Sequence, residues 1–561
     1  MRIVHLREAL LGCLALSLAV AGLAVDQWSG SDRNQGSGSD REQWSGSDRE
    51  QRSRRPASAG VEVAASSGPP ARFHERSVFC PGAVERERPE GTGRGAFRVL
   101  SVYTPRSKGI GVGARPWIEH PTPVDGKMLW LPGADRRAVN VVGSGGRVTA
   151  ASLIGWPATH RRGRRDAAAP GGAGASGCSP VASDRWYFPL GASSAGWDER
   201  ITILNPFPDA AVARVDFAAE PGAKAQDPHE VAVPARSSVQ VEINRVALPD
   251  SSLAATVAVR RGRVVAWKTI FRSRSTVPGR SRSTVPGRSR STIERSFHRL
   301  ARLPGPSPET GPAAGGALFS LGATDTSGRW YFPEAGAGPG RSTTLALMNP
   351  AREPATVTVS LLGRGAIDQT RRLVDVAVPA GGSTFVPLKA SAARRGFLRS
   401  FSAVVVSTGG AEVVAERSMS YGTAGLEGVA SEIGAPRPGR RWSLAPAAAN
   451  PSADDVIVLN PGPQDAVLDL TVFHPSRPGV APPRLQGLVV EAGTRSTIAV
   501  GRHEDENRPG DVKVVDGERG PSPGFVLVRS SAPIVAERRA YSPDRGDVAS
   551  IMGEPLPLGM D

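Results

Sequence analysis

Arg329-Trp330-Tyr331-Phe332-Pro333 is a stretch that the chain repeats: Arg185-Trp186-Tyr187-Phe188-Pro189 matches it fully, and Arg441-Trp442 matches its beginning. An Asn-Pro pair follows each of the three tryptophans at almost the same spacing, at Asn205-Pro206, Asn349-Pro350 and Asn460-Pro461. A third landmark follows each Asn-Pro pair, again at almost the same spacing, at Pro234-Ala235, Pro379-Ala380 and Glu491-Ala492. This agreement in spacing predicts successive copies of one folding unit.

The ends of the copies and an upstream segment extend the repeat. Each copy closes with related strands, within 256–270, 403–421 and 525–541. Trp186 and Trp330 are further apart than Trp330 and Trp442, but the two distances become similar when residues 272–295 are set aside. Those residues carry an Arg-Ser octapeptide, which indicates an insertion into a tolerant loop. Phe79-Cys80-Pro81 and residues 141–154 resemble the first and last strands of the unit, and they predict a fourth, degenerate copy.

Local patterns within the unit indicate strands. Apolar and polar residues alternate from Ala355 to Leu361, which predicts a strand with one buried face. The continuous run from Ala403 to Val406 predicts a strand that is covered on both faces. About seven short strands per unit are typical of an immunoglobulin-like sandwich. We therefore expect an all-β chain of tandem immunoglobulin-like β-sandwich repeats, which follow a signal or anchor segment and a disordered stalk; the pattern does not give the strand order.

The N-terminus has the layout of an export signal. Arg2 and Arg7 precede an uncharged run from Ala9 to Val25, and Ala19-Val20-Ala21 offers a small-x-small cleavage site. Because that run approaches the length that spans a bilayer, an uncleaved anchor is the alternative to a signal peptide. Both alternatives place the protein outside the cytoplasm, secreted or membrane-anchored, with membrane contact only through residues 9–25 if these are kept.

These patterns divide the chain into seven segments. We expect a signal peptide or N-terminal anchor at 1–25, a disordered polar stalk at 26–72, a degenerate β repeat at 73–158, a basic Gly/Ala linker at 159–180, and β-sandwich repeats at 181–325 (with the Arg-Ser insertion at 272–295), 326–436 and 437–561.

Charge and cysteine content limit the function classes. The net charge is +16, of which residues 161–165 contribute +4 and residues 272–302 contribute +8. Because most of the excess lies in linker-like segments, we expect solvated basic loops and no nucleic-acid partner. Cys80 and Cys178 form an even pair that an oxidising compartment can join, and the sequence leaves open whether they are bonded.

The sequence offers no constellation of catalytic or metal-binding residues. The eight histidines are scattered, at His5, His74, His120, His160, His229, His298, His474 and His503. The strongest polar candidates are Glu416-Arg417 and Glu537-Arg538, but Trp267-Lys268 takes their place in another copy, which favours an edge-strand ion pair over chemistry. We expect no catalytic residue, no metal and no cofactor. The repeated tryptophans favour core or inter-repeat packing, with stacking on sugars as the alternative.

The landmarks resemble the Trp-Tyr-Phe-Ala-Glu-Gly repeats of exported proteins from actinobacteria and related high-GC lineages. The match runs through Trp330, Tyr331, Phe332, Asn349, Pro350, Val378, Pro379, Ala380, Ala415, Glu416, Arg417 and Tyr421. The layout over roughly 75–556 also resembles the actinobacterial family catalogued as domain of unknown function five-seven-one-nine. The resemblance implies an exported, envelope-associated role without an assigned activity. Where the common repeat has His-Asp-Ser, this chain has Gly428 to Ser431 and Asp547 to Ser550, so we expect no polar site built on that His-Asp pair.

Two functions remain. The first is a non-catalytic exported structural or adhesion protein of the cell envelope, in which the stalk carries a rod of tandem β-sandwiches. The alternative is a module that binds cell-wall glycan or an anionic polymer through exposed aromatics or the loop 274–290. The expected partners are accordingly a cell-wall polymer or an envelope protein, and we do not expect an enzyme.

Overall fold

The computed structural model describes the strands of the repeats and most of their short connections. The described residues are 71–72, 77–83, 96–103, 109–113, 128–132, 138–144, 148–156, 171–220, 224–272, 315–338, 340–363, 371–372, 375–388, 400–409, 411–423, 426–449, 451–474, 477–501, 512–513, 524–542 and 546–557. All belong to the unit Val63–Asp561. The predicted signal or anchor segment, nearly all of the stalk and nearly all of the Arg-Ser insertion lie outside them. No helix among the described residues is long and apolar enough to cross a membrane.

Repeat 2 shows the complete unit. Its elements are β10 (Arg185–Phe188), β11 (Trp197–Asn205), β12 (Ala211–Ala219), β13 (His229–Val233), β14 (Ser237–Glu242), the short helix α2 (Ile243–Val246), β15 (Leu253–Arg261), β16 (Val265–Arg272) and β17 (Gly316–Leu321). One antiparallel sheet has the order β10-β15-β12-β13 and the other β14-β11-β16-β17. One apolar core fills the space between the two sheets. This confirms the all-β sandwich.

Repeats 1 and 3 follow the same plan. The strands of repeat 1 are β2 (Ser77–Cys80), β3 (Phe97–Tyr103), β4 (Gly109–Gly113), β5 (Met128–Pro132), β6 (Val139–Ser144), β7 (Thr149–Trp156) and β8 (Gly172–Gly177). Those of repeat 3 are β18 (Arg329–Ala335), β19 (Arg341–Met348), β20 (Ala355–Leu362), β21 (Arg371–Arg372), β22 (Val376–Val378), β23 (Ser383–Pro387), β24 (Phe401–Ser407), β25 (Val414–Thr423) and β26 (Leu426–Ile433). A small bridge pairs β1 (Ala71–Arg72) with β9 (Val181–Ala182).

Repeat 4 joins its two sheets through one long strand. Its elements are β27 (Gly439–Leu444), β28 (Ala453–Asn460), β29 (Ala466–His474), β30 (Arg477–Val480), the 3-10 turn η2 (Pro483–Leu485), β31 (Leu488–Val490), β32 (Thr494–Ala499), β33 (Val512–Lys513), β34 (Val526–Ser542), β35 (Asp547–Met552) and β36 (Glu554–Pro555). β34 takes the place of two strands, because it pairs with β29 through its first half and with β28 through its second.

The three tryptophans of the sequence pattern occupy one structural position. Trp186, Trp330 and Trp442 are 1%, 3% and 0% exposed. Each indole Nε1 donates a hydrogen bond to a backbone carbonyl, as a buried indole requires. The acceptors are Val264 at 2.8 Å, Val413 at 2.8 Å and Ile534 at 2.9 Å. Core packing of these rings is therefore confirmed, and sugar stacking by them is excluded because their faces lie inside the sandwich.

The Asn-Pro and Pro-Ala landmarks meet in space. The Asn205 Oδ1 accepts from the amide of Phe207 at 3.0 Å, and its Nδ2 donates to the Val233 carbonyl at 3.2 Å, just before the Pro-Ala turn. Asn349 and Asn460 make the same two contacts in their own repeats. One fully buried side-chain amide thus ties two turns together, which explains why the spacing between these landmarks hardly varies.

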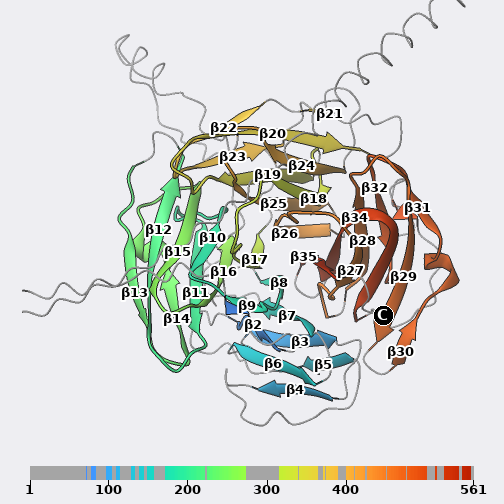
Figure 1. Ribbon diagram of the computed structural model, residues 1–561, viewed down its shortest axis with the longest axis horizontal. Coiled ribbons are helices and arrows are strands. Elements are labelled where there is room, and N and C mark those ends of the chain that lie inside the picture. The colour runs from blue at the N-terminus through green and yellow to red at the C-terminus, as the bar shows by residue number, and fades with distance from the viewer. Residues whose placement is uncertain are drawn as a thin grey trace, which may run out of the picture. The chain divides into compact units, whose positions relative to one another are not determined.

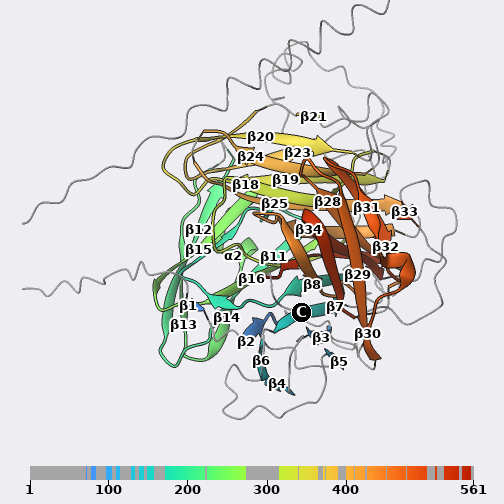
Figure 2. The same cartoon turned by 45° about the vertical axis from the view of Figure 1, so that its right-hand side comes forward.

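Each of the four repeats contacts the next, and the last contacts the first. The apolar core of repeat 2 includes Trp156 of repeat 1, and another cluster joins Val99 and Tyr103 of repeat 1 to Phe525 and Ile551 of repeat 4. Figure 2 shows the long strands of repeat 4 beside β7 and β8. The predicted rod is therefore wrong, since a linear row leaves its two ends apart. Apolar surface on the first and last repeats is buried by closing the circuit.

The structure also corrects a boundary and a strand count. Residues 172–177, which we expected within a linker, form β8, which completes the sheet of repeat 1 by pairing with β7. Glycine and alanine suit this strand because its neighbours approach closely: a Cβ on Gly172 would lie 2.5 Å from the Ala317 Cβ. Repeat 2 has one strand more than the expected seven, since β17 follows the Arg-Ser insertion. The run Ala403 to Val406 is covered on both faces, as predicted: Val405 packs in its own repeat and Val404 against repeat 4.

Candidate functional site

The last strand of each repeat lies where the four repeats meet. We call β8, β17, β26 and β35 the axial strands; Figure 1 shows them in the middle of the four groups of strands. Each is paired along one side only, to β7, β16, β25 or β34, so its other edge carries backbone groups without a ladder partner. Neighbouring axial strands contact one another around the circuit. Four sheet edges therefore converge on one place.

The Asp547 carboxylate joins these four edges. Its Oδ2 accepts from the amides of Ala173 and Ala317, each at 2.9 Å, and its Oδ1 accepts from those of Val429 at 2.8 Å and Val548 at 2.9 Å. One amide comes from each axial strand. The carboxylate is fully buried, and burial raises its pKa to about 8 although the four amides favour the ionised form.

The strand register explains why only one repeat carries this aspartate. The residues equivalent to Asp547 are Gly172, Gly316 and Gly428. A Cβ added to Gly316 or Gly428 would lie 2.7 or 2.1 Å from the Asp547 Oδ1. There is room for one side chain among four positions. The expectation concerned only a polar site built on a His-Asp pair, and the site described here is a different one, since it is made by Asp547 and four backbone amides.

Buried ion pairs connect repeat 2 to repeat 3 and repeat 3 to repeat 4. The Lys268 Nζ lies 2.7 Å from the Glu416 Oε2, and both side chains are fully buried. That oxygen also accepts from the amide of Leu190, at 3.1 Å. The Lys268 ammonium donates in turn to the Leu190 carbonyl. Repeat 2 thus supplies the cation, the amide and the carbonyl, and repeat 3 supplies the carboxylate.

The next junction repeats this arrangement with arginine. Arg417 Nη1 and Nη2 donate to the two carboxylate oxygens of Glu537 at 2.8 and 2.5 Å, and Nη1 also donates to the Glu334 carbonyl at 2.6 Å. Burial disfavours the charge on Arg417, but Glu537 outweighs it and the pKa of Arg417 is raised. The predicted edge-strand ion pair is therefore wrong. β25 and β34 are interior strands, and each glutamate pairs with the preceding repeat and not with the neighbouring arginine.

Repeat 4 adds charged groups that sequence reasoning missed. Arg538, equivalent to Arg417, donates to both oxygens of Asp454 of its own repeat at 2.7 and 2.6 Å. Arg539 bridges Asp455 to Glu334 of repeat 3. Two features of the sequence could have drawn attention to these groups: Glu334, which follows the Trp-Tyr-Phe motif, and the arginine pair Arg538-Arg539 in the last repeat. Neither feature identifies the partner of the charged group.

A cavity of ≈ 310 Å³ opens at the other end of the axial strands. Its mouth is lined by four equivalent residues, Gly177, Leu321, Ile433 and Met552. The preceding residue of each strand lies deeper, at Ser176, Ser320, Glu432 and Ile551. We call this cavity the axial pocket. Burial raises the pKa of Glu432, as do the charges of Glu537 and Glu416.

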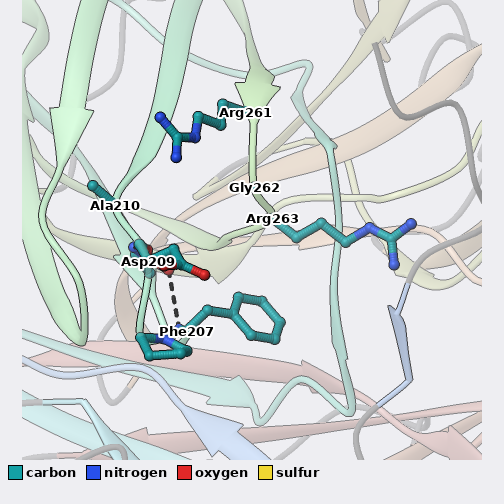
Figure 3. A pocket seen from close by; sticks show the side chains of 8 residues that line it. Phe207, Asp209, Ala210, Arg261, Gly262 and Arg263 are labelled. Carbon is teal, nitrogen blue, oxygen red and sulfur yellow. Dashed lines mark hydrogen bonds between the residues drawn. The ribbon is translucent and has the colours of Figure 1, made fainter. Parts of the chain in front are cut away.

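A second depression of ≈ 410 Å³ lies on repeat 2 at the Asn-Pro turn. Figure 3 shows Arg261 and Arg263 on either side of Gly262, with Phe207 and Asp209 from the turn opposite them. This surface therefore combines an aromatic ring with two guanidinium groups.

The remaining candidates from the sequence do not converge. Within the described ranges only His229 and His474 occur, on β13 and β29 of different repeats. No group of three or more His, Cys, Asp or Glu that could hold a metal was found in that part of the chain. Cys80 and Cys178 are bonded to each other, with their Cα atoms 4.2 Å apart, which joins β2 to the residue that follows β8.

Comparison with known proteins identifies a family. No curated protein matches the chain. A match among solved structures, titled "Crystal Structure of Thermotoga maritima 1070", is 17% identical and covers 20% of this chain and 95% of that chain. The TM-score of this match is 0.17. A model described as "Family of unknown function (DUF5719)" matches residues 156–279 and 318–551, well over half of the sequence. The chain therefore belongs to this family of unknown function, as the landmarks of its repeats indicated.

Proposed function

We propose that the protein is a non-catalytic, exported structural or adhesion protein of the cell envelope, and that its four repeats act as one displayed unit. The observation that carries this proposal is the role of the charged residues that the sequence offered as site candidates. Lys268, Glu416, Arg417 and Glu537 are fully buried and paired between repeats, where they hold the repeats together. A substrate cannot contact side chains that are buried and paired in this way, so their arrangement supports a structural role over an enzymatic one.

The disulfide and the N-terminal layout support export. A bond between Cys80 and Cys178 suits an oxidising compartment, since cytosolic thiols are kept reduced. Residues 1–25 have the order of charged, apolar and small residues that secretion requires. Both lines of support are independent of the family match, which assigns no activity.

Surface proteolysis of intact cells tests export directly. The full chain with a C-terminal tag is expressed in an actinobacterial host, and intact cells are treated with protease. We expect the tag in the medium or cleaved at the surface, and the two cysteines resistant to alkylation until reduced. A tag that is protected in intact cells and released with the cytoplasmic fraction would refute the proposal.

Binding of an anionic wall polymer is the second candidate, and the depression of Figure 3 favours it. Arg261 and Arg263 can contact phosphate or carboxylate groups while Phe207 packs against a sugar ring. Retention on purified cell wall should fall in Arg261→Gln/Arg263→Gln and as salt rises. A chain that lacks residues 273–294 separates this depression from the Arg-Ser insertion. If the full chain is not retained at low salt, polymer binding is excluded.

A further inference from the structure

The axial pocket is asymmetric at its mouth. Three of its four equivalent mouth positions carry large apolar residues, Leu321, Ile433 and Met552, and the fourth is Gly177. A Cβ built on Gly177 would meet no atom within 4 Å. The missing side chain therefore leaves the pocket open on the β8 side, where a ligand can enter between apolar walls.

Glu432 is a buried carboxyl group in the lining of this pocket that forms no ion pair with another described residue. It is 8% exposed and lies near two other carboxylates, Glu416 and Glu537. Those two are matched by Lys268 and Arg417 in the ion pairs already described. Arg417 and the backbone amide of Met552 favour the charged form of Glu432, but the Nη1 and Nη2 of Arg417 both bond Glu537. Burial without a matching cation therefore favours the neutral form of Glu432, and a bound cation would stabilise its charged form.

A second buried group in the pocket lacks a partner. Ser320 lies at the position equivalent to Glu432 and is 3% exposed, and its Oγ makes no hydrogen bond. Its other equivalent, Ser176, uses its hydroxyl to accept from the amide of Leu321 at 3.2 Å. The Ser320 Oγ therefore has an unused acceptor position beneath the lining of the pocket.

The chemistry of the lining selects an organic cation over a metal ion. A calcium ion takes six to eight oxygen ligands, several of them usually carboxylates, whereas the side chains of the pocket supply one carboxylate and two serine hydroxyls. The apolar mouth suits methylene groups. Arg437 also lines the pocket, but it is exposed and its guanidinium can stay in water. We propose that the axial pocket binds the ammonium group of a small alkylamine, with Glu432 as its counter-ion and Ser320 as a hydrogen-bond acceptor.

Calorimetry on the full chain tests this with three probes of the same chain length. n-Butylammonium should bind with one site per chain, and n-butanol and butyrate should bind at least tenfold more weakly. Glu432→Gln should weaken butylammonium binding at least tenfold and Ser320→Ala about threefold. Gly177→Leu gives the open position the residue found at its equivalent Leu321, touches no neighbour at its Cβ, and should abolish binding without lowering the melting temperature.

The contrary outcomes are distinct. Equal affinity of Glu432→Gln and the unaltered chain, both with unchanged near-ultraviolet circular dichroism, would overturn the role of the carboxylate. Tighter binding of butyrate than of butylammonium would assign the pocket to an anion held by Arg437. Absence of heat for all three probes with the unaltered chain would show that the pocket is not an amine site.

Discussion

The four junctions of the circuit are of two kinds. Between repeats 2 and 3 and between repeats 3 and 4, a buried cation meets a buried glutamate of the next repeat. Between repeats 1 and 2, Trp156 packs edge-on against Phe271 at 5.2 Å; between repeats 4 and 1, Tyr103 packs against Phe473 at 4.7 Å. The residues equivalent to Glu416 and Glu537 are Trp267 in repeat 2 and Ala151 in repeat 1. The same strand position therefore carries glutamate at the ionic junctions and an apolar residue at the apolar junctions.

Ionic and apolar junctions differ in how strongly they select the neighbour of a repeat. Apolar contacts are forgiving, because any apolar surface of about the right size gains from burial. A buried carboxylate tolerates few neighbours, because leaving it without a partner costs more free energy than most contacts contribute. Lys268 and Arg417 therefore disfavour packings in which repeats 2, 3 and 4 meet in another way. The two apolar junctions are those of the degenerate repeat 1, which has in addition the bond between Cys80 and Cys178.

The largest expected effect concerns pH and the place where both kinds of junction meet. The pKa of Asp547 is raised from 3.8 to about 8 in the folded state. The folded chain therefore holds a proton that the unfolded chain releases, so this contribution is complete below about pH 4 and is lost as the pH rises to 8. We expect a loss on the order of 5 kcal/mol over that window, measured by urea unfolding. Asp547→Asn should weaken the dependence without abolishing it, because the raised pKa of Glu432 acts in the same direction; an unchanged profile would contradict a protonated Asp547.

Removing one half of an ionic junction should come next. Glu537→Gln leaves the Arg417 guanidinium buried without a counter-ion, and we expect the free energy of unfolding to fall by about 3–5 kcal/mol. Chemical denaturation measures it. The double variant Arg417→Met/Glu537→Leu is the control, because it removes both charges and should lose less than the single variant. A larger loss in the double variant would show that the pair contributes net stability.

Removing the disulfide tests how much it stabilises repeat 1, which forms the two apolar junctions. Cys80→Ser/Cys178→Ser, or reduction of the unaltered chain, should lower stability by about 2–4 kcal/mol, because the bond closes a long loop in the unfolded state. Thermal unfolding with and without reductant measures the change. The serine variant should be indifferent to reductant, and a reductant effect on it would mean that the shift has another source.

The smallest effect is expected at an apolar junction. Phe473→Leu keeps an apolar side chain but loses the ring contact with Tyr103, and it should cost about 1 kcal/mol. Combined with Glu537→Gln, its effect should add to within about 0.5 kcal/mol, since the two residues serve different junctions. If the two changes in the free energy of unfolding depart strongly from additivity, opening one junction strains the other. The ionic and apolar junctions would then not be independent.

The folding unit and its repetition could be predicted from the amino-acid sequence. The repeated tryptophan needs a hydrogen-bond acceptor for its buried N–H. The repeated asparagine bonds two turns of its own repeat. Both requirements keep the spacing of these residues nearly constant from one repeat to the next. Alternation and continuous apolar runs predicted strands with one or two covered faces. These features are local, because each is decided by contacts within one sandwich.

The contacts between the repeats could not be predicted from the sequence. Asp547 accepts from Ala173, 374 positions away, and nothing in the pattern around either residue records the other. The Gly-rich run 172–177 has the composition of a linker, and it is a strand because Ala317 and its neighbours approach it closely. Glu416 beside Arg417 suggested a local pair, whereas each pairs with a different repeat. Contacts between units depend on the path of the whole chain, since a side chain's partner there is set by where a distant strand arrives.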